Sequence, residues 1–234
     1  MKKFLIGLVL VIGVPILALR IAYPSFFWNQ KVTVTVNTPN GEVSAHAVGQ
    51  VKVSEKVGFG IVEASGVSRS FKGEAVAVEL PDQKYLFALI NDAAHFNYKV
   101  FSDELGLNKK PGQKPGWQKQ AQITIRLQEP KAFTSEFIPL LVTFDDINDP
   151  RSVQEVDPAN LAATFGPGYS LQSITLEITD EPVTEGEVEK VLGWLNDYKQ
   201  KQYRLNGAKC VACPFSSDNL SDLLSGSNFK IGTN

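Results

Sequence analysis

The chain has 234 residues and a formal net charge of −2 at pH 7, so its overall charge does not indicate nucleic acid or an acidic polymer as a partner. Hydrophobic residues make up 43% of the chain and charged residues 21%, as in an ordinary globular protein. The two cysteines, Cys210 and Cys213, lie near the end of the chain, which excludes a fold stabilised mainly by disulfides.

A nearly unbroken apolar run covers residues 4–23, directly behind Lys2 and Lys3. About 20 such residues can cross roughly 30 Å of hydrocarbon as a helix. Because positively charged flanks stay in the cytoplasm, we expect the rest of the chain on the other side of the membrane. Three aromatic residues, 26–28, follow the run and are suited to the level of the lipid headgroups.

A cleaved signal peptide is the alternative interpretation of this run. Cleavage requires small residues in an Ala-x-Ala-like pattern, and Arg20 occupies one of those places when Ala22 occupies the other. We therefore predict an uncleaved signal anchor within residues 1–28. Its single transmembrane helix would bind the cell inner membrane through residues 4–23 and leave a C-terminal domain facing the periplasm.

Alternating apolar and polar residues predict that strands dominate the domain formed by residues 29–198. The predicted strands are 31–36, 43–53, 74–80, 85–90, 121–127, 137–144 and 171–178. The alternation slips near Gly49, which predicts a bend or bulge there. Residues 81–84 should close a hairpin, and residues 108–119, with two Pro-Gly pairs, should form a loop.

Three short helices are predicted between and after these strands. They span 92–105, the residues from Asp157 as N-cap to Gly166, and a segment that begins with a capping box of Thr184 and Glu187. Residues 199–234 are rich in polar residues and predict a mostly disordered tail. The predicted fold class is α+β: an N-terminal transmembrane helix followed by a largely antiparallel β-sheet or sandwich with three short helices.

The stretch Leu140–Val153, together with residues 157–168, resembles a group of small signal-anchored bacterial envelope proteins that have no assigned activity. These proteins carry the same acidic Asp-Pro stretch and the helix after it, and the likeness runs from the anchor to about Trp194. The resemblance implies a bacterial inner-membrane location facing the periplasm. It implies no catalytic residue.

An acidic stretch is the densest group of oxygen ligands in the chain. It contains Asp145, Asp146, Asn148, Asp149 and Asp157. A cation such as Ca²⁺ needs several such oxygens on one loop, but Ile147 falls at a ligand position of the EF-hand spacing. Paired carboxylates for acid/base chemistry are a further interpretation. Alternatively, these residues end a strand, cap turns and pair with Arg151.

The predicted loop 108–119 combines positive charge with one indole. It carries Lys109, Lys110, Lys114, Trp117 and Lys119. Such a loop is suited to contact with anionic headgroups or a cell-wall polymer. Alternatively, the lysines are solvated and Trp117 packs onto the body of the domain.

The remaining motifs indicate little chemistry. His46 and His95 occur in no metal-binding or triad motif, which favours structural or surface roles. Residues 58–60 form a Gly-x-Gly without the βαβ setting of a dinucleotide site. The Cys-x-x-Cys motif of Cys210 and Cys213 lies in a polar tail, where a small local disulfide is expected; intermolecular bridging and thiol exchange are the alternatives.

These patterns together predict a membrane-anchored extracytoplasmic domain that binds an envelope protein or helps to organise the envelope. Neither a cofactor nor a catalytic motif is indicated, and no nucleic acid is expected as a partner. The alternative is an envelope hydrolase or metal-dependent enzyme centred on residues 145–157, which requires a pocket where those carboxylates converge. A thiol-redox role is the third hypothesis.

Overall fold

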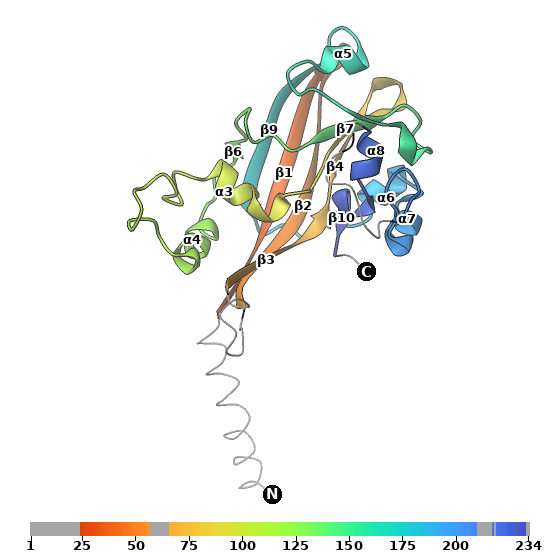
Figure 1. Ribbon diagram of the computed structural model, residues 1–234. Helices are drawn as coiled ribbons and strands as arrows, with labels where there is room; N and C mark the ends of the chain where they lie inside the picture. The colour runs from red at the N-terminus through yellow and green to blue at the C-terminus, as the bar shows by residue number, and fades with distance from the viewer. Residues whose placement is uncertain (1–23, 57–65, 210–216, 218, 233–234) are drawn as a thin grey trace, which may run out of the picture.

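The computed structural model describes residues 24–56, 66–209, 217 and 219–232. Within these residues the protein is α+β, with two antiparallel sheets and six helices (Figure 1). The predicted fold class is confirmed in this coarser form, although the helices outnumber the three predicted. No helix in the described ranges is long and apolar enough to cross a membrane, and the predicted transmembrane helix lies outside them.

The larger sheet is built around one long hairpin. Its strand order is β10-β3-β2-β1-β9-β6, with the bounds β1 Ser25–Thr38, β2 Gly41–Lys56, β3 Gly66–Glu74, β6 Lys131–Ala132, β9 Ser170–Thr179 and β10 Lys230–Ile231. A tight turn at Pro39 and Asn40 connects β1 to β2, and Gly41, the first residue of β2, has a φ of +116° that favours glycine. Three of the predicted strands, 31–36, 43–53 and 171–178, are confirmed and prove longer than the pattern indicated.

The expected bulge at Gly49 is wrong. β2 pairs with β1 in unbroken register through this position, with Gly49 opposite Gln30. The ring of Phe71 lies over the glycine, so an added Cβ would fall 2.1 Å from Phe71 Cζ. The alternation slips because Val48 is also buried, on the other face of β2. Its backbone amide donates to Thr184 Oγ1 over 2.9 Å at the edge of β2 that β3 does not cover.

The smaller sheet has the order β4-β5-β7-β8 and packs against the larger one (Figure 1). Its strands are β4 Val76–Leu80, β5 Lys84–Ala88, β7 Leu141–Phe144 and β8 Val153–Glu155. The predicted hairpin is confirmed, with residues 81–83 as a 3₁₀ turn between β4 and β5. The main core lies between the two sheets and includes Val34, Val36, Leu86, Phe87, Leu141, Val142, Leu176 and Phe229.

One predicted strand, 121–127, is instead mostly helical. Helix α4 spans Trp117–Thr124, and Trp117, Ala121 and Thr124 recur at the spacing of one helix face. Ala121 packs in a second, smaller core with Trp28 on β1. The β-branched residues of this segment favoured a strand, but burial of this face against the sheet outweighs that preference.

The other helices have the bounds α3 Phe96–Val100, α5 Leu161–Phe165, α6 Glu187–Val191, α7 Leu195–Lys201 and α8 Leu220–Leu223. α3 is shorter than predicted, α5 and α6 begin later than predicted, and α8 falls in the predicted tail. α3 follows a 3₁₀ turn, Ala93–His95, and does not continue to Leu105. The predicted caps are wrong: α5 begins after Asn160 and α6 begins after Gly186. Thr184 bonds the edge of β2, so it cannot form a capping box.

The tail after residue 198 is folded wherever the structure describes it. Phe229 has no exposed surface and its carbonyl accepts from the amide of Ala75 over 2.7 Å. β10 then pairs with the end of β3, with Lys230 opposite Glu74. The expectation of a mostly disordered tail is therefore wrong for these residues, because the sheet edge supplies hydrogen-bond partners that composition does not reveal.

Candidate functional site

The acidic stretch forms the turn between β7 and β8. Asp146 accepts a hydrogen bond from the amide of Asn148 over 2.9 Å. Asp149 accepts from the amide and the guanidinium of Arg151 over 2.9–3.0 Å. The hydrogen bonds from Arg151 lower the pKa of Asp149. These carboxylates therefore satisfy donors within their own turn, as the alternative interpretation of the stretch proposed.

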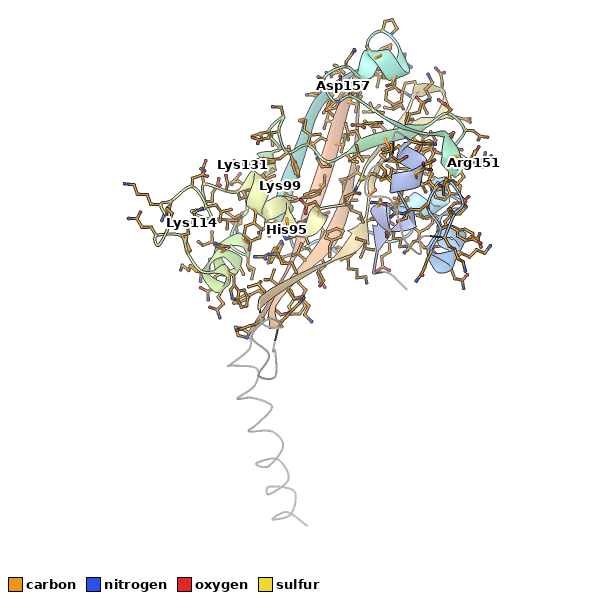
Figure 2. The ribbon with its side chains drawn as sticks, in the orientation of Figure 1. His95, Lys99, Lys114, Lys131, Arg151 and Asp157 are labelled. Atoms are coloured by element: carbon orange, nitrogen blue, oxygen red, sulfur yellow. The ribbon has the colours of Figure 1, made fainter. Side chains whose placement is uncertain are left out.

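The remaining carboxylates of the stretch point to other partners. Asp145 accepts from the amide group of Gln154 over 2.5 Å, and Asp157 accepts from the backbone of Ala159 over 2.8 Å. Figure 2 shows Asp157 well apart from Arg151, near the far end of the large sheet. Among the residues described by the structure, no three His, Cys, Asp or Glu side chains are grouped as metal ligands would be.

We expect calcium to leave the stability of this protein unchanged, because the four aspartates of the stretch accept hydrogen bonds from separate local donors. A site with a dissociation constant of about 0.1 mM would stabilise the fold by about 2.3 kcal/mol at about 5 mM calcium. Thermal unfolding with and without calcium measures this. A rise in Tm that disappears in the double variant Asp146→Asn, Asp149→Asn would contradict the expectation.

The lysine-rich loop and Trp117 are separated by the fold. Lys109 and Lys110 are exposed, and Figure 2 shows Lys114 projecting away from the sheets. Trp117 starts α4 and packs edge-on against Phe26, with ring centroids 5.8 Å apart. Its indole thus packs against the second core, in agreement with the alternative interpretation, whereas the lysines of the loop are exposed to solvent.

A cleft lies at the end of the large sheet where β1 begins, and we call it the basal cleft. It has a volume of about 310 Å³ and is lined by Phe27, Trp28, Asn29, Gln50, Ile125, Leu127, Gln128, Ile178, Thr179 and Asp180. β9 ends at Thr179 opposite Asn29, so the first residues of β1 extend beyond it. Phe27 and Ile125 line the cleft and are 49% and 45% exposed. They are the two exposed large hydrophobic residues of the described chain.

A buried charge cluster ties β10 to α6 and the end of β3. Glu74 is 2% exposed and accepts from the amides of Gly186 and Glu187, each over 3.0 Å. Burial raises the pKa of Glu74, and the two amides oppose the rise. Lys230 is 6% exposed and forms an ion pair with Glu189. Sequence analysis missed this cluster because its members are far apart in the chain and occur in no motif.

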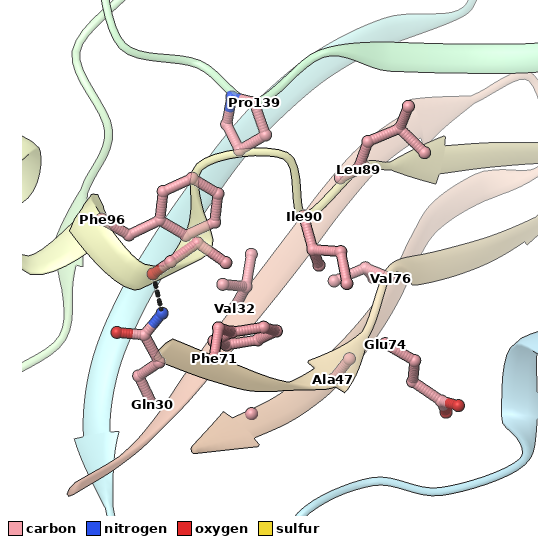
Figure 3. Close-up of a pocket in the computed structure, with 13 residues that line it drawn as sticks. Gln30, Val32, Ala47, Phe71, Glu74, Val76, Leu89, Ile90, Phe96 and Pro139 are labelled. Carbon is pink, nitrogen blue, oxygen red and sulfur yellow. Dashed lines mark hydrogen bonds between the residues drawn. The ribbon is translucent and has the colours of Figure 1, made fainter. Parts of the chain in front are cut away.

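The cavity between the sheets is too small for a ligand. It has a volume of about 10 Å³, which is room for about one water molecule, and Gln30 donates there to the carbonyl of Ala93 over 2.7 Å (Figure 3).

The two histidines lie at the surface in different places. His46 is exposed on β2, and His95 lies 2.9 Å from Asp92. The two histidines therefore have separate surroundings, as expected.

Two of the sequence motifs lie outside the residues that the structure describes. These are the Gly-x-Gly of residues 58–60 and the Cys-x-x-Cys of Cys210 and Cys213. The local disulfide thus stays a prediction.

Comparison with known proteins gives no relative. The chain matches no protein family model, no curated protein and no solved structure. The resemblance to signal-anchored envelope proteins accordingly stays a prediction, and the function must be argued from the chain itself.

Proposed function

We propose that this protein is a single-pass, membrane-anchored binding protein whose folded domain faces the periplasm at the bacterial inner membrane. The observation that carries the proposal is the short distance in sequence between the apolar run and the sheet. The run ends at Tyr23, and β1 starts at Ser25 with Pro24 alone between them. A rigid strand that begins so close to a membrane span holds its first residues at the membrane surface.

The chemistry of that end of the sheet supports the proposal. The start of β1, the end of β2 and the start of β3 lie together there, with Ser25 opposite Ser54 and Ser54 opposite Ser68 (Figure 1). Phe27 and Ile125, the two exposed large hydrophobic side chains of the described residues, line the basal cleft at the same end. Aromatic and aliphatic side chains at the level of the headgroups are typical of domains that rest on a membrane.

The hydrolase alternative has no observation in its favour. It required the carboxylates of residues 145–157 to converge in a pocket. Asp145, Asp146, Asp149 and Asp157 instead accept hydrogen bonds from separate nearby donors. We therefore do not propose it. The partner in the envelope is expected to contact the basal cleft, where apolar surface is exposed next to the membrane.

Extraction of the full-length protein from its native membrane tests the anchor. We expect detergent, and not alkaline carbonate, to release it, with Met1 retained. The double variant Leu10→Lys, Val11→Lys should appear in the soluble fraction, because each charge at the centre of a span costs about 2.5–3.5 kcal/mol. Release of the wild type by carbonate, or a mature N-terminus near Tyr23, would refute the anchor.

A photoreactive residue placed in the basal cleft tests the binding surface. At position 27 we expect crosslinks to lipid or to an envelope protein. Asn37 is exposed at the opposite end of β1 and serves as the matched control position, where we expect none. Equal crosslinking at 27 and 37, or none at either, would contradict a role for the basal cleft.

A further inference from the structure

A second cleft lies between the second half of α7, with the segment that follows it, and the 3₁₀ turn Gly226–Asn228. We call it the lateral cleft. It has a volume of about 530 Å³ and is lined by Tyr198, Lys199, Gln202, Tyr203, Arg204 and residues 225–228. Arg204 connects the two walls, since it pairs with Ser225 in a β-bridge and its guanidinium donates to the carbonyl of Leu223. The cleft therefore has defined sides and is not a gap between independent loops.

The lining of the lateral cleft is positive and rich in hydroxyl groups. Two cations, Lys199 and Arg204, line it, and none of its lining residues is acidic. Hydroxyl groups come from two tyrosines on one wall and from Ser225 and Ser227 on the other. The two serine hydroxyls share a hydrogen bond of 2.7 Å, and Ser225 also donates to Asn228. Hydroxyl groups donate hydrogen bonds readily to an anion. The chemistry of the cleft thus complements a negatively charged, oxygen-rich group.

Lys199 contributes to this lining a positive charge that has no ion-pair partner among the described residues. Its neighbours are paired: Lys201 lies 2.7 Å from Asp197, and Lys230 pairs with Glu189. Within the described chain, the Lys199 ammonium has no hydrogen bond or ion pair. Burial lowers the pKa of Lys199, the charge of Lys230 lowers it further, and the charge of Glu189 opposes both, so that the net shift is downward. A nearby anion would offset both effects.

Gly226 holds the stem of Lys199 in place. A Cβ at position 226 would lie 2.6 Å from Lys199 Cγ, so the lysine stem packs directly on the glycine. The φ of Gly226 is not positive, so room for the lysine, and not backbone conformation, requires glycine here.

We propose that the lateral cleft binds a phosphate-bearing small molecule, whose phosphate oxygens accept hydrogen bonds from the Lys199 ammonium and from the Ser227 hydroxyl, which gives up its bond to Ser225. A tetrahedral anion suits donors that approach from two walls, and lysine serves as a compact charge for phosphate. This site gives the proposed binding protein a class of ligand. It rests on the proposed function only for the compartment, the periplasm, in which the ligand would be met. The site itself stands independently of the anchor, because its residues lie entirely in the folded domain.

Acylation of individual lysines, read by mass spectrometry, tests the site on the full-length protein in nanodiscs of phosphatidylcholine. Inorganic phosphate is the probe, and chloride at equal ionic strength is the control. We expect about 10 mM phosphate to slow acylation of Lys199 at least about fivefold and to leave Lys201 unchanged. Equal rates at Lys199 in phosphate and chloride would overturn the proposal.

Variants separate binding from general charge effects. By calorimetric titration with inorganic phosphate, Lys199→Met should weaken binding at least about tenfold, because it keeps the stem and removes the charge. Gly226→Ala should also weaken binding, since it displaces the stem. Lys201→Met, two residues away in sequence and paired with Asp197, should change affinity less than about twofold. Equal losses for Lys199→Met and Lys201→Met would refute a specific site.

A second acylation experiment distinguishes a lipid headgroup from a soluble phosphate compound as the ligand. The acylation is repeated without free phosphate, in nanodiscs that contain phosphatidylglycerol. Protection of Lys199 there assigns a lipid headgroup as the ligand, and protection by free phosphate alone assigns a soluble one. Absence of protection in both arms rejects the site but leaves the anchor untouched, because carbonate extraction tests the anchor separately.

Discussion

Replacing Lys230 with methionine should lower the free energy of unfolding by about 3–5 kcal/mol, because it leaves a buried carboxylate without its partner. The side chains of Lys230 and Glu189 are 8% and 15% exposed in their ion pair. The other oxygen of Glu189, Oε2, is buried without a hydrogen-bond partner in the described structure. Water therefore cannot easily compensate the loss of the ammonium, and urea unfolding measures the effect.

A double-mutant cycle and a surface control show whether burial is the cause. The double variant Lys230→Met, Glu189→Leu should recover much of the loss, since it removes the orphaned charge as well. Lys72 pairs with Glu185 at the surface, with side chains 44% and 54% exposed, so Lys72→Met should lose at most about 1 kcal/mol. A loss for Lys230→Met no greater than that for Lys72→Met would contradict the expectation.

The pH dependence of the same variant follows from Glu74. Burial raises the pKa of Glu74 above its ordinary value, so its contribution to stability is full below that ordinary value and is lost as the pH rises through the folded pKa. The charge of Lys230 opposes the rise. The destabilisation by Lys230→Met should therefore be greater at pH 7 than at pH 4.

Replacing Phe229 with alanine should also lower the free energy of unfolding by about 3–5 kcal/mol, because it leaves a cavity in a cluster of aromatic rings. Phe229 has no exposed surface. Its ring centroid lies 5.8 Å from that of Phe87, 5.9 Å from that of Phe144 and 6.1 Å from that of Trp194. The residue thus joins the C-terminal segment to both the smaller sheet and α7.

The matched control for Phe229 is Phe27, which is 49% exposed at the basal cleft. Phe27→Ala removes the same atoms from a site open to water and should cost less than about 1 kcal/mol. Comparison of the two variants by urea unfolding decides whether the tail belongs to the core. Similar small losses for both would show that the C-terminal segment adds little to the stability of the domain.

Local periodicity was sufficient for the elements whose residues alternate over many positions. The β1–β2 hairpin, the β4–β5 hairpin and β9 could be predicted because side chains on a half-buried strand must alternate between water and core. The acidic turn at Asp149 and Arg151 could also be interpreted from sequence, because its partners are two residues apart and each carboxylate finds a donor nearby.

Tertiary contacts decided the rest, because the energies concerned arise between segments that are distant in sequence. Ala121 is helical since it packs beside Trp28, and Gly49 is required since Phe71 lies over it. Phe229 and Lys230 fold the tail through partners more than 40 residues away, Phe87 and Glu189 among them. The lateral cleft likewise joins Lys199 to Ser227 across an intervening segment. Periodicity shows only which residues of one element share a face. The positions of these residues depend instead on the buried surface and the charges of residues from distant segments that they contact.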